Sequence, residues 1–184
     1  MIKRIFNLII SEFLILIESP IIFYPSSKIA NKARSIYFKK KLKMDSYPAV
    51  ISSNFEVRCS NLIEIGDKFM VNKNVTVDAC GSSGVYIGNQ VMFGPNTYIR
   101  AANHSFDNDK PIQEQGLDFK TVIFNKKSFS IVIEDNVWIG ANCIILSGAH
   151  IGTGSVLNAG SVVSSIIPEG SIVAGNPGRI IKKR

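Results

Sequence analysis

Aliphatic residues return at every sixth position between Ile133 and Ile167, and compact residues hold the fifth position of each hexad. The aliphatic positions are Ile133, Ile139, Ile145, Ile151, Leu157 and Val163, and the compact ones are Val137, Cys143, Ala149, Ser155 and Ser161. A helix would repeat about every 3.6 residues and a half-buried strand about every two, so neither gives a period of six. A fixed short period indicates a solenoid, in which each hexad forms a short strand and a corner.

Three hexads can close one triangular coil. Each strand of such a coil pairs with the coils above and below it, so unpaired edges remain only at the two ends. Crossovers between parallel strands are usually right-handed, but the hexapeptide class is an exception to that rule, and the six-residue period selects it. The pattern therefore predicts an all-β solenoid, a left-handed parallel β-helix, with an N-terminal helical segment and an ejected loop.

The hexad spacing continues upstream of Ile133, with two interruptions. Ile65, Val71 and Val77 are six apart, as are Ile87, Phe93 and Ile99. Between these two sets, residues 79–84 add four residues to the spacing, which predicts a loop at a corner. The hexads stop after Ile99, and the polar, turn-rich segment at about residues 101–130 predicts a loop that leaves the solenoid. Long loops of this kind are usually functional.

The N-terminal segment, residues 1–49, differs from the solenoid in charge and in pattern. Residues 1–44 carry nine Lys and Arg against two Glu, which accounts for the whole net charge of +7. The apolar run at residues 5–17 contains Glu12 and is too short for a transmembrane helix, and no clean signal-cleavage site follows it. Its apolar residues fall near one face, which predicts an amphipathic helix, and residues 28–43 predict a second, basic helix.

Two roles for the amphipathic helix remain open. It packs on the end of the solenoid or on a neighbouring subunit, or it lies on an anionic membrane with help from the basic residues that follow it. The second role predicts peripheral membrane association through residues 1–44, for a cytoplasmic protein at the inner face of the cell membrane. We expect the β-helix itself at residues 50–174, followed by a basic tail at residues 175–184.

The remaining composition excludes several classes of protein. With 184 residues, 46% of them hydrophobic, the chain can form one domain with a substantial core. Its three cysteines form no CxxC pair and it has two histidines, so we expect no metal site and a buried structural thiol at Cys143. Nothing in the cysteine spacing indicates an oxidising compartment. The basic segment lacks interleaved aromatic residues, so nucleic acid is not an expected partner.

His104 is the first candidate for chemistry, because it stands where the regular hexads give way to the loop. A histidine at such a position can exchange protons near neutral pH. The alternative interpretation is an exposed loop histidine without a catalytic role. His150 closes a hexad and is expected to be a surface residue.

Four motifs in a fixed order resemble those of the hexapeptide-repeat acyltransferases. They are IEIGD at Ile63–Asp67, Asn103-His104 in the loop, IEDNVWIG at Ile133–Gly140 and AGNPGR at Ala174–Arg179. The resemblance covers about residues 50–181 and points to the branch that contains galactoside and maltose O-acetyltransferases and surface-polysaccharide acetyltransferases. It implies a left-handed β-helix, acetyl-CoA as co-substrate, a sugar or oligosaccharide acceptor, and a homotrimer with clefts between its subunits.

The resemblance also implies roles for individual residues. His104 matches the catalytic histidine, and the positions that match acceptor-binding residues are Asn74, Asp78, Asn103 and Trp138. The positions that match coenzyme A-binding residues are Gly140, Ala141, Ala159, Ser165 and Arg179. Relatives often have Thr-Lys where this chain has Ser164-Ser165, so a basic contact to coenzyme A is lost or comes from Lys182 or Lys183.

The implied reaction is acetyl transfer from acetyl-CoA to a sugar hydroxyl in surface-polysaccharide biosynthesis, with His104 as general base. Asp107 and Asp109 are candidates for orienting His104. N-acetylation of a nucleotide-linked or lipid-linked amino sugar is a second interpretation, because it uses the same coils and the same co-substrate. A non-catalytic hexapeptide-repeat assembly scaffold is a third, and the position of His104 in the loop argues against it.

Overall fold

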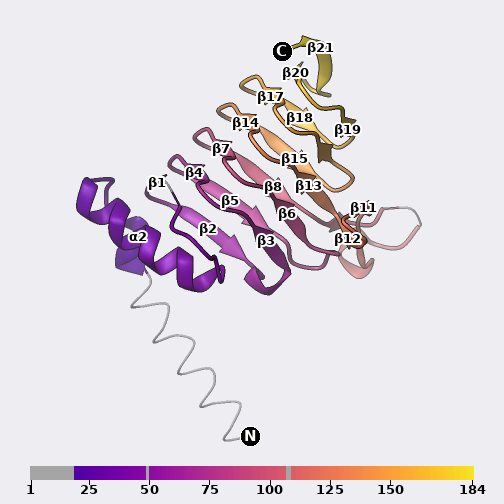
Figure 1. Cartoon of the computed structure of the whole chain (residues 1–184). Coiled ribbons are helices and arrows are strands. Elements are labelled where there is room, and N and C mark those ends of the chain that lie inside the picture. Colours follow the sequence, from indigo (N-terminus) through magenta and orange to yellow (C-terminus); the bar gives the residue numbers. More distant parts are fainter. Residues whose placement is uncertain (1–18, 49, 107–108) are drawn as a thin grey trace, which may run out of the picture.

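A computed structural model describes residues 19–48, 50–106 and 109–184 of the chain. The amphipathic helix expected from residues 5–17 lies outside these residues. Within them, no helix is long and apolar enough to cross a membrane. Figure 1 shows a stack of β-strands with a helix at one end and the C-terminal strands at the other.

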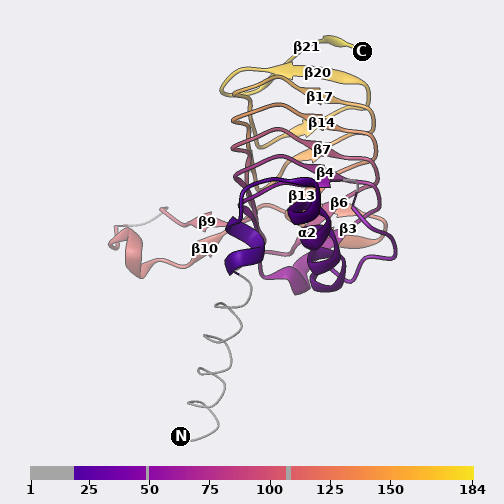
Figure 2. The same ribbon diagram turned by 90° about the vertical axis from the view of Figure 1, so that its left-hand side faces the viewer.

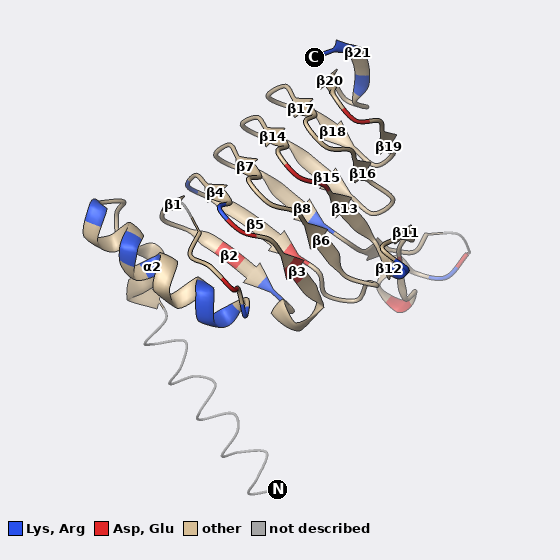
Figure 3. Ribbon diagram, viewed as in Figure 1, with Lys and Arg blue, Asp and Glu red and all other residues tan. Residues whose placement is uncertain are grey.

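Helix α2 (Lys28–Lys41) confirms the second, basic helix that the sequence predicts. It begins after Ser27, whose hydroxyl oxygen accepts a hydrogen bond from the backbone N–H of Ala30 at 3.1 Å, as an N-cap side chain does. Lysines fill its last turn, where positive charge interacts favourably with the helix dipole. Figure 3 shows these basic residues beside the first strands of the stack. Phe38 is buried against Phe55 of the first coil, with ring centroids 4.6 Å apart, so α2 caps that end of the stack.

The chain visits three sheets, A, B and C, in a fixed order. Sheet A contains β1 (Val50–Ile51), β4 (Met70–Val71), β7 (Met92–Phe93), β14 (Trp138–Ile139), β17 (Val156–Leu157), β20 (Ser171–Ala174) and β21 (Arg179–Lys183). Sheet B contains β2 (Phe55–Arg58), β5 (Val75–Asp78), β8 (Tyr98–Arg100), β15 (Ile144–Leu146) and β18 (Val162–Val163). Sheet C contains β3 (Ile63–Ile65), β6 (Val85–Ile87), β13 (Ile131–Ile133), β16 (His150–Ile151) and β19 (Ile166–Ile167).

Strand pairing within these sheets is parallel, except between β20 and β21. The parallel β architecture that the hexads predict is therefore confirmed, and Figure 2 shows the coils stacked on one another. The short 3₁₀ turn η1 (Ser60–Leu62) leads from β2 into β3 in the first coil. Residues 175–184, expected as a basic tail, contain β21, which pairs antiparallel with the last strand of the stack.

The aliphatic position of each hexad points into the core of the stack. The sheet B residues Val77, Ile99, Ile145 and Val163 stand in register on successive strands, and all are buried. Burying one such side chain stabilises the fold by about 1.5–3 kcal/mol. The period of six in the sequence is thus the spacing between successive core positions along the coil.

Asparagines form a ladder along the corner between sheets A and B. Asn54, Asn74, Asn96 and Asn142 all have a left-handed backbone, with φ between 56° and 59°. The side-chain amide of each of the first three donates a hydrogen bond to the side-chain oxygen of the next asparagine, at 2.8 to 3.1 Å. Asparagine tolerates this conformation better than most side chains. The ladder therefore fixes where the chain turns from sheet A to sheet B.

The segment that leaves the stack after β8 forms two antiparallel strand pairs, where the sequence predicts a loop. β9 (Asn103–His104) pairs with β10 (Leu117–Asp118), and the 3₁₀ turn η2 (Ile112–Glu114) lies between them. β11 (Val122–Phe124) pairs with β12 (Lys127–Phe129). Figure 2 shows the β9–β10 pair, called the arm below, projecting away from the stack.

The β11–β12 pair lies against the outer face of sheet C. The rings of Phe124 and Phe129 lie 4.9 and 5.6 Å from the ring of Tyr86, and Phe124 lies 5.6 Å from the imidazole of His150. Aromatic pairs at these separations stabilise beyond the area that they bury. The second half of the ejected segment is therefore packed on the stack, while the arm extends beyond it.

His150 is half-buried, which corrects the expectation of a surface residue. Its Nε2 lies 2.6 Å from Oε1 of Glu134, and Thr153 donates hydrogen bonds from its N–H and its hydroxyl to Oε2. Burial raises the pKa of Glu134, but the hydrogen bonds with His150 and Thr153 outweigh burial, so the pKa lies below its ordinary value of 4.5. The ionised carboxylate is therefore the form that the fold favours.

Replacing Glu134 by Gln is expected to destabilise the protein by about 1 kcal/mol at neutral pH. A carboxylate whose pKa is lowered by folding stabilises the fold at pH values above 4.5, the pKa in the unfolded chain. This stabilisation is lost as the pH falls through the lower pKa of the folded protein. The difference in unfolding free energy between wild type and Glu134→Gln should therefore shrink below pH 4.5. Urea denaturation at a series of pH values measures this difference in unfolding free energy, and Glu169→Gln, at an exposed position, is the control. A difference that does not change with pH would contradict an ionised, stabilising Glu134.

Candidate functional site

His104 lies on β9, in the arm, four residues after the end of β8. Its side chain is exposed, and its partner across the arm is Leu117 of β10. The neighbouring Asn103 is also exposed and pairs with Asp118. Asp107 lies outside the described residues, and within them no hydrogen bond joins Asp109 to His104. The arm thus presents the imidazole outside the stack.

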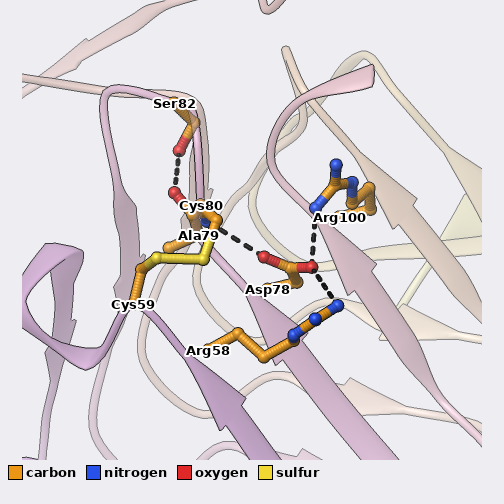
Figure 4. Close-up of polar contacts among 7 residues, drawn as sticks. All are labelled: Arg58, Cys59, Asp78, Ala79, Cys80, Ser82 and Arg100. Atoms are coloured by element: carbon orange, nitrogen blue, oxygen red, sulfur yellow. Dashed lines mark hydrogen bonds and ion pairs between the residues drawn. A yellow bond between two sulfur atoms is a disulfide. The ribbon is translucent and has the colours of Figure 1, made fainter. Parts of the chain in front are cut away.

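Asp78 is a buried carboxylate at the end of β5, held by two guanidinium groups. Its Oδ2 lies 2.6 Å from Nη1 of Arg100 and 3.3 Å from Nη1 of Arg58. Its Oδ1 accepts a hydrogen bond from the backbone N–H of Cys80 at 3.0 Å, and Figure 4 shows the three contacts together. The carboxylate therefore joins three consecutive coils, and its role as an acceptor contact stays a prediction.

Cys59 and Cys80 form a disulfide, with Cα atoms 5.2 Å apart. They are 21 residues apart in the sequence, but they stand at the same corner of adjacent coils, after β2 and β5. This pairing corrects the expectation that the cysteines carry no sign of oxidation. Cys143 is buried as predicted, and burial raises the pKa of its thiol, which keeps it a poor nucleophile.

Three of the residues expected to bind coenzyme A share the corner between sheets A and B with Asn74. Gly140 and Ala141 follow β14, and Ala159 follows β17 on the next coil. A β-carbon on Gly140 would lie 2.7 Å from the backbone nitrogen of Ala159, so a larger residue would force these coils apart. Asn74 stands on the same corner, where the asparagine ladder uses both its amide and its carbonyl.

The other two residues expected to bind coenzyme A, Ser165 and Arg179, lie at different corners of the stack. Ser165 is exposed at the corner between sheets B and C, and its carbonyl oxygen accepts a hydrogen bond from the N–H of His150 at 3.3 Å. Arg179 is exposed and opens β21, opposite Ala174. Ser165 is on the same corner as the departure point of the arm. Arg179 instead lies beside the corner between sheets A and B at the C-terminal end of the stack, because Ala174 ends β20 there.

Trp138 projects from the outer face of sheet A and is 54% exposed. It stands in register with Met92 on one side and Val156 on the other. The row continues to Met70 and Ile172, which makes an apolar row across sheet A, called the sheet A ladder below. Trp138 is therefore part of a continuous apolar face, on a different side of the stack from the arm.

The predicted site residues do not meet within one chain. His104, Asp78 and Ser165 belong to the corner between sheets B and C, whereas Asn74 and Gly140 belong to the corner between sheets A and B. The strands of sheet B separate the two corners, since Asn74 and Asp78 flank opposite ends of β5. A site that used both sets would need a second copy of the chain to bring them together.

Known proteins resemble this chain in sequence and in fold. The family profile described as "Bacterial transferase hexapeptide (six repeats)" matches residues 130–165. A galactoside O-acetyltransferase of Lactococcus lactis subsp. lactis is 36% identical over 121 residues, which are 66% of this chain and 53% of that protein. The crystal structure of the hexapeptide-repeat acetyltransferase VCA0836 of Vibrio cholerae, complexed with acetyl coenzyme A, has a TM-score of 0.59 and 34% identity, covering 70% of this chain and 64% of that one.

The chain carries the hexapeptide repeat of this profile and resembles acetyltransferases over about two thirds of its own length. A further relative, from Escherichia coli K12, carries the provisional name of lipopolysaccharide biosynthesis O-acetyl transferase WbbJ, and is 35% identical over 125 residues, or 66% of this chain and 61% of that protein. The chain thus spans between about half and three fifths of the length of these curated relatives.

Proposed function

We propose that this chain transfers an acetyl group from acetyl-CoA to a sugar hydroxyl, with His104 as general base. The observation that carries the proposal is the exposed His104 on an arm that projects from hexapeptide-repeat coils. Relatives named galactoside O-acetyltransferase support a sugar as acceptor, and a related structure solved with acetyl coenzyme A supports the donor. The coils are inferred to wind left-handed, as the hexapeptide class does; a right-handed trace in a crystal structure would contradict this.

The proposed mechanism needs no covalent intermediate on the protein. A sugar hydroxyl is a poor nucleophile at neutral pH, so an imidazole nitrogen of His104 removes its proton as its oxygen attacks the thioester carbonyl. Backbone N–H groups of the coil or the arm stabilise the tetrahedral oxyanion. The carbon–sulfur bond then breaks, and the imidazolium returns the proton to the departing thiolate. Holding both substrates at once supplies the proximity that the direct transfer requires.

The coenzyme is proposed to lie along the corner between sheets A and B, where Gly140, Ala141 and Ala159 present backbone with little side chain. Ser165 lies on the corner between sheets B and C, so it cannot join this corner within one subunit. Arg179 pairs with Ala174 at the C-terminal end of the same corner. An assembly that faces one chain's corner between sheets B and C toward another chain's corner between sheets A and B would join the two sets. The proposed site therefore lies between subunits.

We expect a homotrimer whose contacts include the sheet A ladder. Trp138 and Met92 are 54% and 44% exposed, and a continuous apolar face of this kind is typical of an interface. Replacing Met92 by Lys should shift the trimer to smaller species in sedimentation equilibrium. The control is Ile166→Lys, which places the same charge on the exposed outer face of sheet C. A wild type that sediments as a monomer, or two variants that behave alike, would contradict the proposal.

N-acetylation of an amino sugar is the second candidate, because a neutral amine is a better nucleophile than a hydroxyl and uses the same donor. The two candidates separate in a coenzyme A-release assay that compares galactose and maltose with glucosamine. The O-acetyltransferase proposal expects release with the hydroxyl-only sugars. Release with glucosamine alone, and an amide in the product, would favour N-acetylation.

The acceptor is proposed to be a surface polysaccharide or its lipid-linked precursor, reached from the inner face of the cell membrane. The basic helix α2 supports this: its Lys28 and Lys32 form no hydrogen bond or ion pair within the described residues, and Ile29 between them is 84% exposed. Apolar and basic side chains side by side suit an anionic lipid surface.

Deleting residues 1–19 should lower the fraction of protein that sediments with anionic lipid vesicles. The wild type should also lose binding as salt is raised, since the attraction between lysines and lipid headgroups is screened. Neutral vesicles serve as the control for non-electrostatic binding. Equal sedimentation of the full chain and the deletion variant would remove the N-terminal segment from the proposal.

A further inference from the structure

The turn at residues 79–84 inserts four residues into the hexad spacing at the corner between sheets B and C. It follows β5, and β5 pairs with β8, the strand from which the arm departs. Its contacts join three parts of the chain that are distant in sequence: the preceding coil, the arm, and the point where the ejected segment re-enters the stack.

The first contact fixes the start of the turn to both neighbouring coils. The disulfide ties Cys80 to Cys59 on the preceding coil. The Cys80 N–H donates to Asp78, and Asp78 in turn holds Arg100 at the end of β8, as Figure 4 shows. The turn is therefore anchored from below by a covalent bond and from above by a buried ion pair.

The second contact reaches the arm. A β-carbon on Gly81 would lie 2.1 Å from Cδ1 of Leu117, so the leucine side chain occupies space that only glycine leaves open. Leu117 belongs to β10, where it stands directly opposite His104. The turn thus touches the residue that is paired with the proposed general base.

The third contact closes the ejected segment. The N–H of Ser83 donates to Oγ of Ser130 at 3.0 Å, and the N–H of Ser130 donates to the carbonyl oxygen of Gly84 at 2.8 Å. Ser130 immediately precedes β13, with which the chain rejoins sheet C. One turn therefore holds both the strand opposite His104 and the end of the segment that carries it.

We propose that Leu117 is a positioning residue for His104, and that the Cys59–Cys80 disulfide makes this positioning sensitive to reduction. The disulfide fixes the turn, the turn holds Leu117, and Leu117 holds the strand that pairs with His104. A dithiol reduces the disulfide to two thiols and is itself oxidised to a disulfide, so two electrons and two protons pass to the cysteines. The effect on catalysis rests on the proposed function, whereas the effect on the arm does not.

Hydrogen exchange of the arm tests the structural part without any assay of activity. Treatment with dithiothreitol should raise the exchange rate of amides at residues 103–105 and 116–118 by roughly tenfold, since the arm loses a fixed support. The Cys59→Ser/Cys80→Ser variant should exchange at the raised rate with or without dithiothreitol, and it retains Cys143 as a control for effects on that thiol. Unchanged exchange in the arm of the reduced protein would overturn the proposal.

Two glycines with the same backbone strain provide a matched pair. Gly81 has φ +71° and Gly154 has φ +70°, but a β-carbon on Gly154 would meet no atom within 4 Å. Alanine at either position carries a similar conformational cost. Only Gly81→Ala should displace Leu117 and raise exchange in the arm. Equal amide exchange rates in the arms of Gly81→Ala and Gly154→Ala would show that the contact between residue 81 and Leu117 does not hold the arm.

Kinetics test the link to His104. Leu117→Ala should lower kcat by roughly tenfold or more, because small misplacements of a catalytic group are costly, while KM for acetyl-CoA stays unchanged. Leu117→Met should restore most of kcat, and Ile112→Ala, an exposed residue of the same arm, should leave kcat at the wild-type value. A Leu117→Ala enzyme with wild-type kcat overturns the positioning role. A wild type that acetylates no acceptor overturns the proposed function instead, and the exchange result then decides the positioning proposal alone.

Discussion

His104→Ala is expected to lower kcat for acetyl transfer by roughly 10² to 10⁴-fold, the range in which a positioned general base contributes. Without the imidazole, the acceptor hydroxyl keeps its proton during attack, and the departing thiolate has no nearby acid. KM for acetyl-CoA should change little, because the residues proposed to bind the coenzyme lie on the coils. Steady-state kinetics with a saturating acceptor measure both constants.

The exposure of His104 makes this variant easy to interpret. An exposed side chain in the arm can be removed without opening a cavity, so the unfolding free energy should stay within about 0.5 kcal/mol of wild type. His150→Asn is the matched control: it removes the other histidine and its contact with Glu134, so it should cost stability but not kcat. A His104→Ala enzyme with wild-type kcat would remove the imidazole from the mechanism.

Arg34→Ala is expected to destabilise the N-terminal part of the fold by about 3–5 kcal/mol, because it leaves several buried hydrogen-bond acceptors unpaired and removes a large buried side chain. The guanidinium of Arg34 is fully buried and donates hydrogen bonds at 2.8 to 3.1 Å to the backbone carbonyl oxygens of Ile21, Tyr24 and Ile51. It also donates to the side-chain oxygen of Asn31 at 2.7 Å. Alanine leaves these acceptors without partners and leaves a cavity beside them.

Urea denaturation followed by circular dichroism measures the loss, and hydrogen exchange locates it. Exchange should rise in α2 and β1, which Arg34 joins, and stay low in sheet B. Lys32→Ala is the control, since Lys32 lies on the same helix, is exposed, and makes no hydrogen bond or ion pair within the described residues. A loss below 1 kcal/mol for Arg34→Ala, similar to that for Lys32→Ala, would contradict the role of the buried guanidinium.

The sequence predicts the stack well because each hexad has one large aliphatic core position, followed by a compact buried residue at its fifth position. Ile139, Ile145 and Ile151 belong to three different sheets, yet their spacing of six shows directly where each strand turns inward. The sequence also predicts the ejected segment, because the segment interrupts that pattern, and it predicts His104 as the candidate catalytic residue in the segment. The β-pairs inside the segment are not predicted, because Phe124 and Phe129 pack on Tyr86, which lies some 40 residues away in sequence.

The disulfide and the buried ion pair are not predicted from the sequence for a related reason. Cys59, Cys80 and the Arg58–Asp78–Arg100 cluster are brought together by one-coil separations of 20 to 22 residues. The irregular turn at residues 79–84 lies within the separation between Asp78 and Arg100. A hexad count alone does not reveal how many residues a corner contains. Once β2, β5 and β8 are aligned in register, Arg58, Asp78 and Arg100 fall in one row at the ends of their strands.

The site residues show the limit of a residue-by-residue resemblance. It assigns Asn74, Trp138 and His104 to one site, yet in a single chain they stand on a corner, on the face of sheet A, and on the arm. Sequence positions carry no information on which chain supplies each residue. This is why the assembly state and the chemistry are linked in the proposed function.

The most direct measurement of the central proposal is the product formed from acetyl-CoA and a panel of neutral sugars, analysed by mass spectrometry and NMR alongside coenzyme A release. We expect one acetyl ester on a sugar oxygen for each coenzyme A released by the wild type, and neither product above background with His104→Ala. Coenzyme A release without any acetylated sugar, or an acetylated sugar formed equally well by His104→Ala, would contradict it.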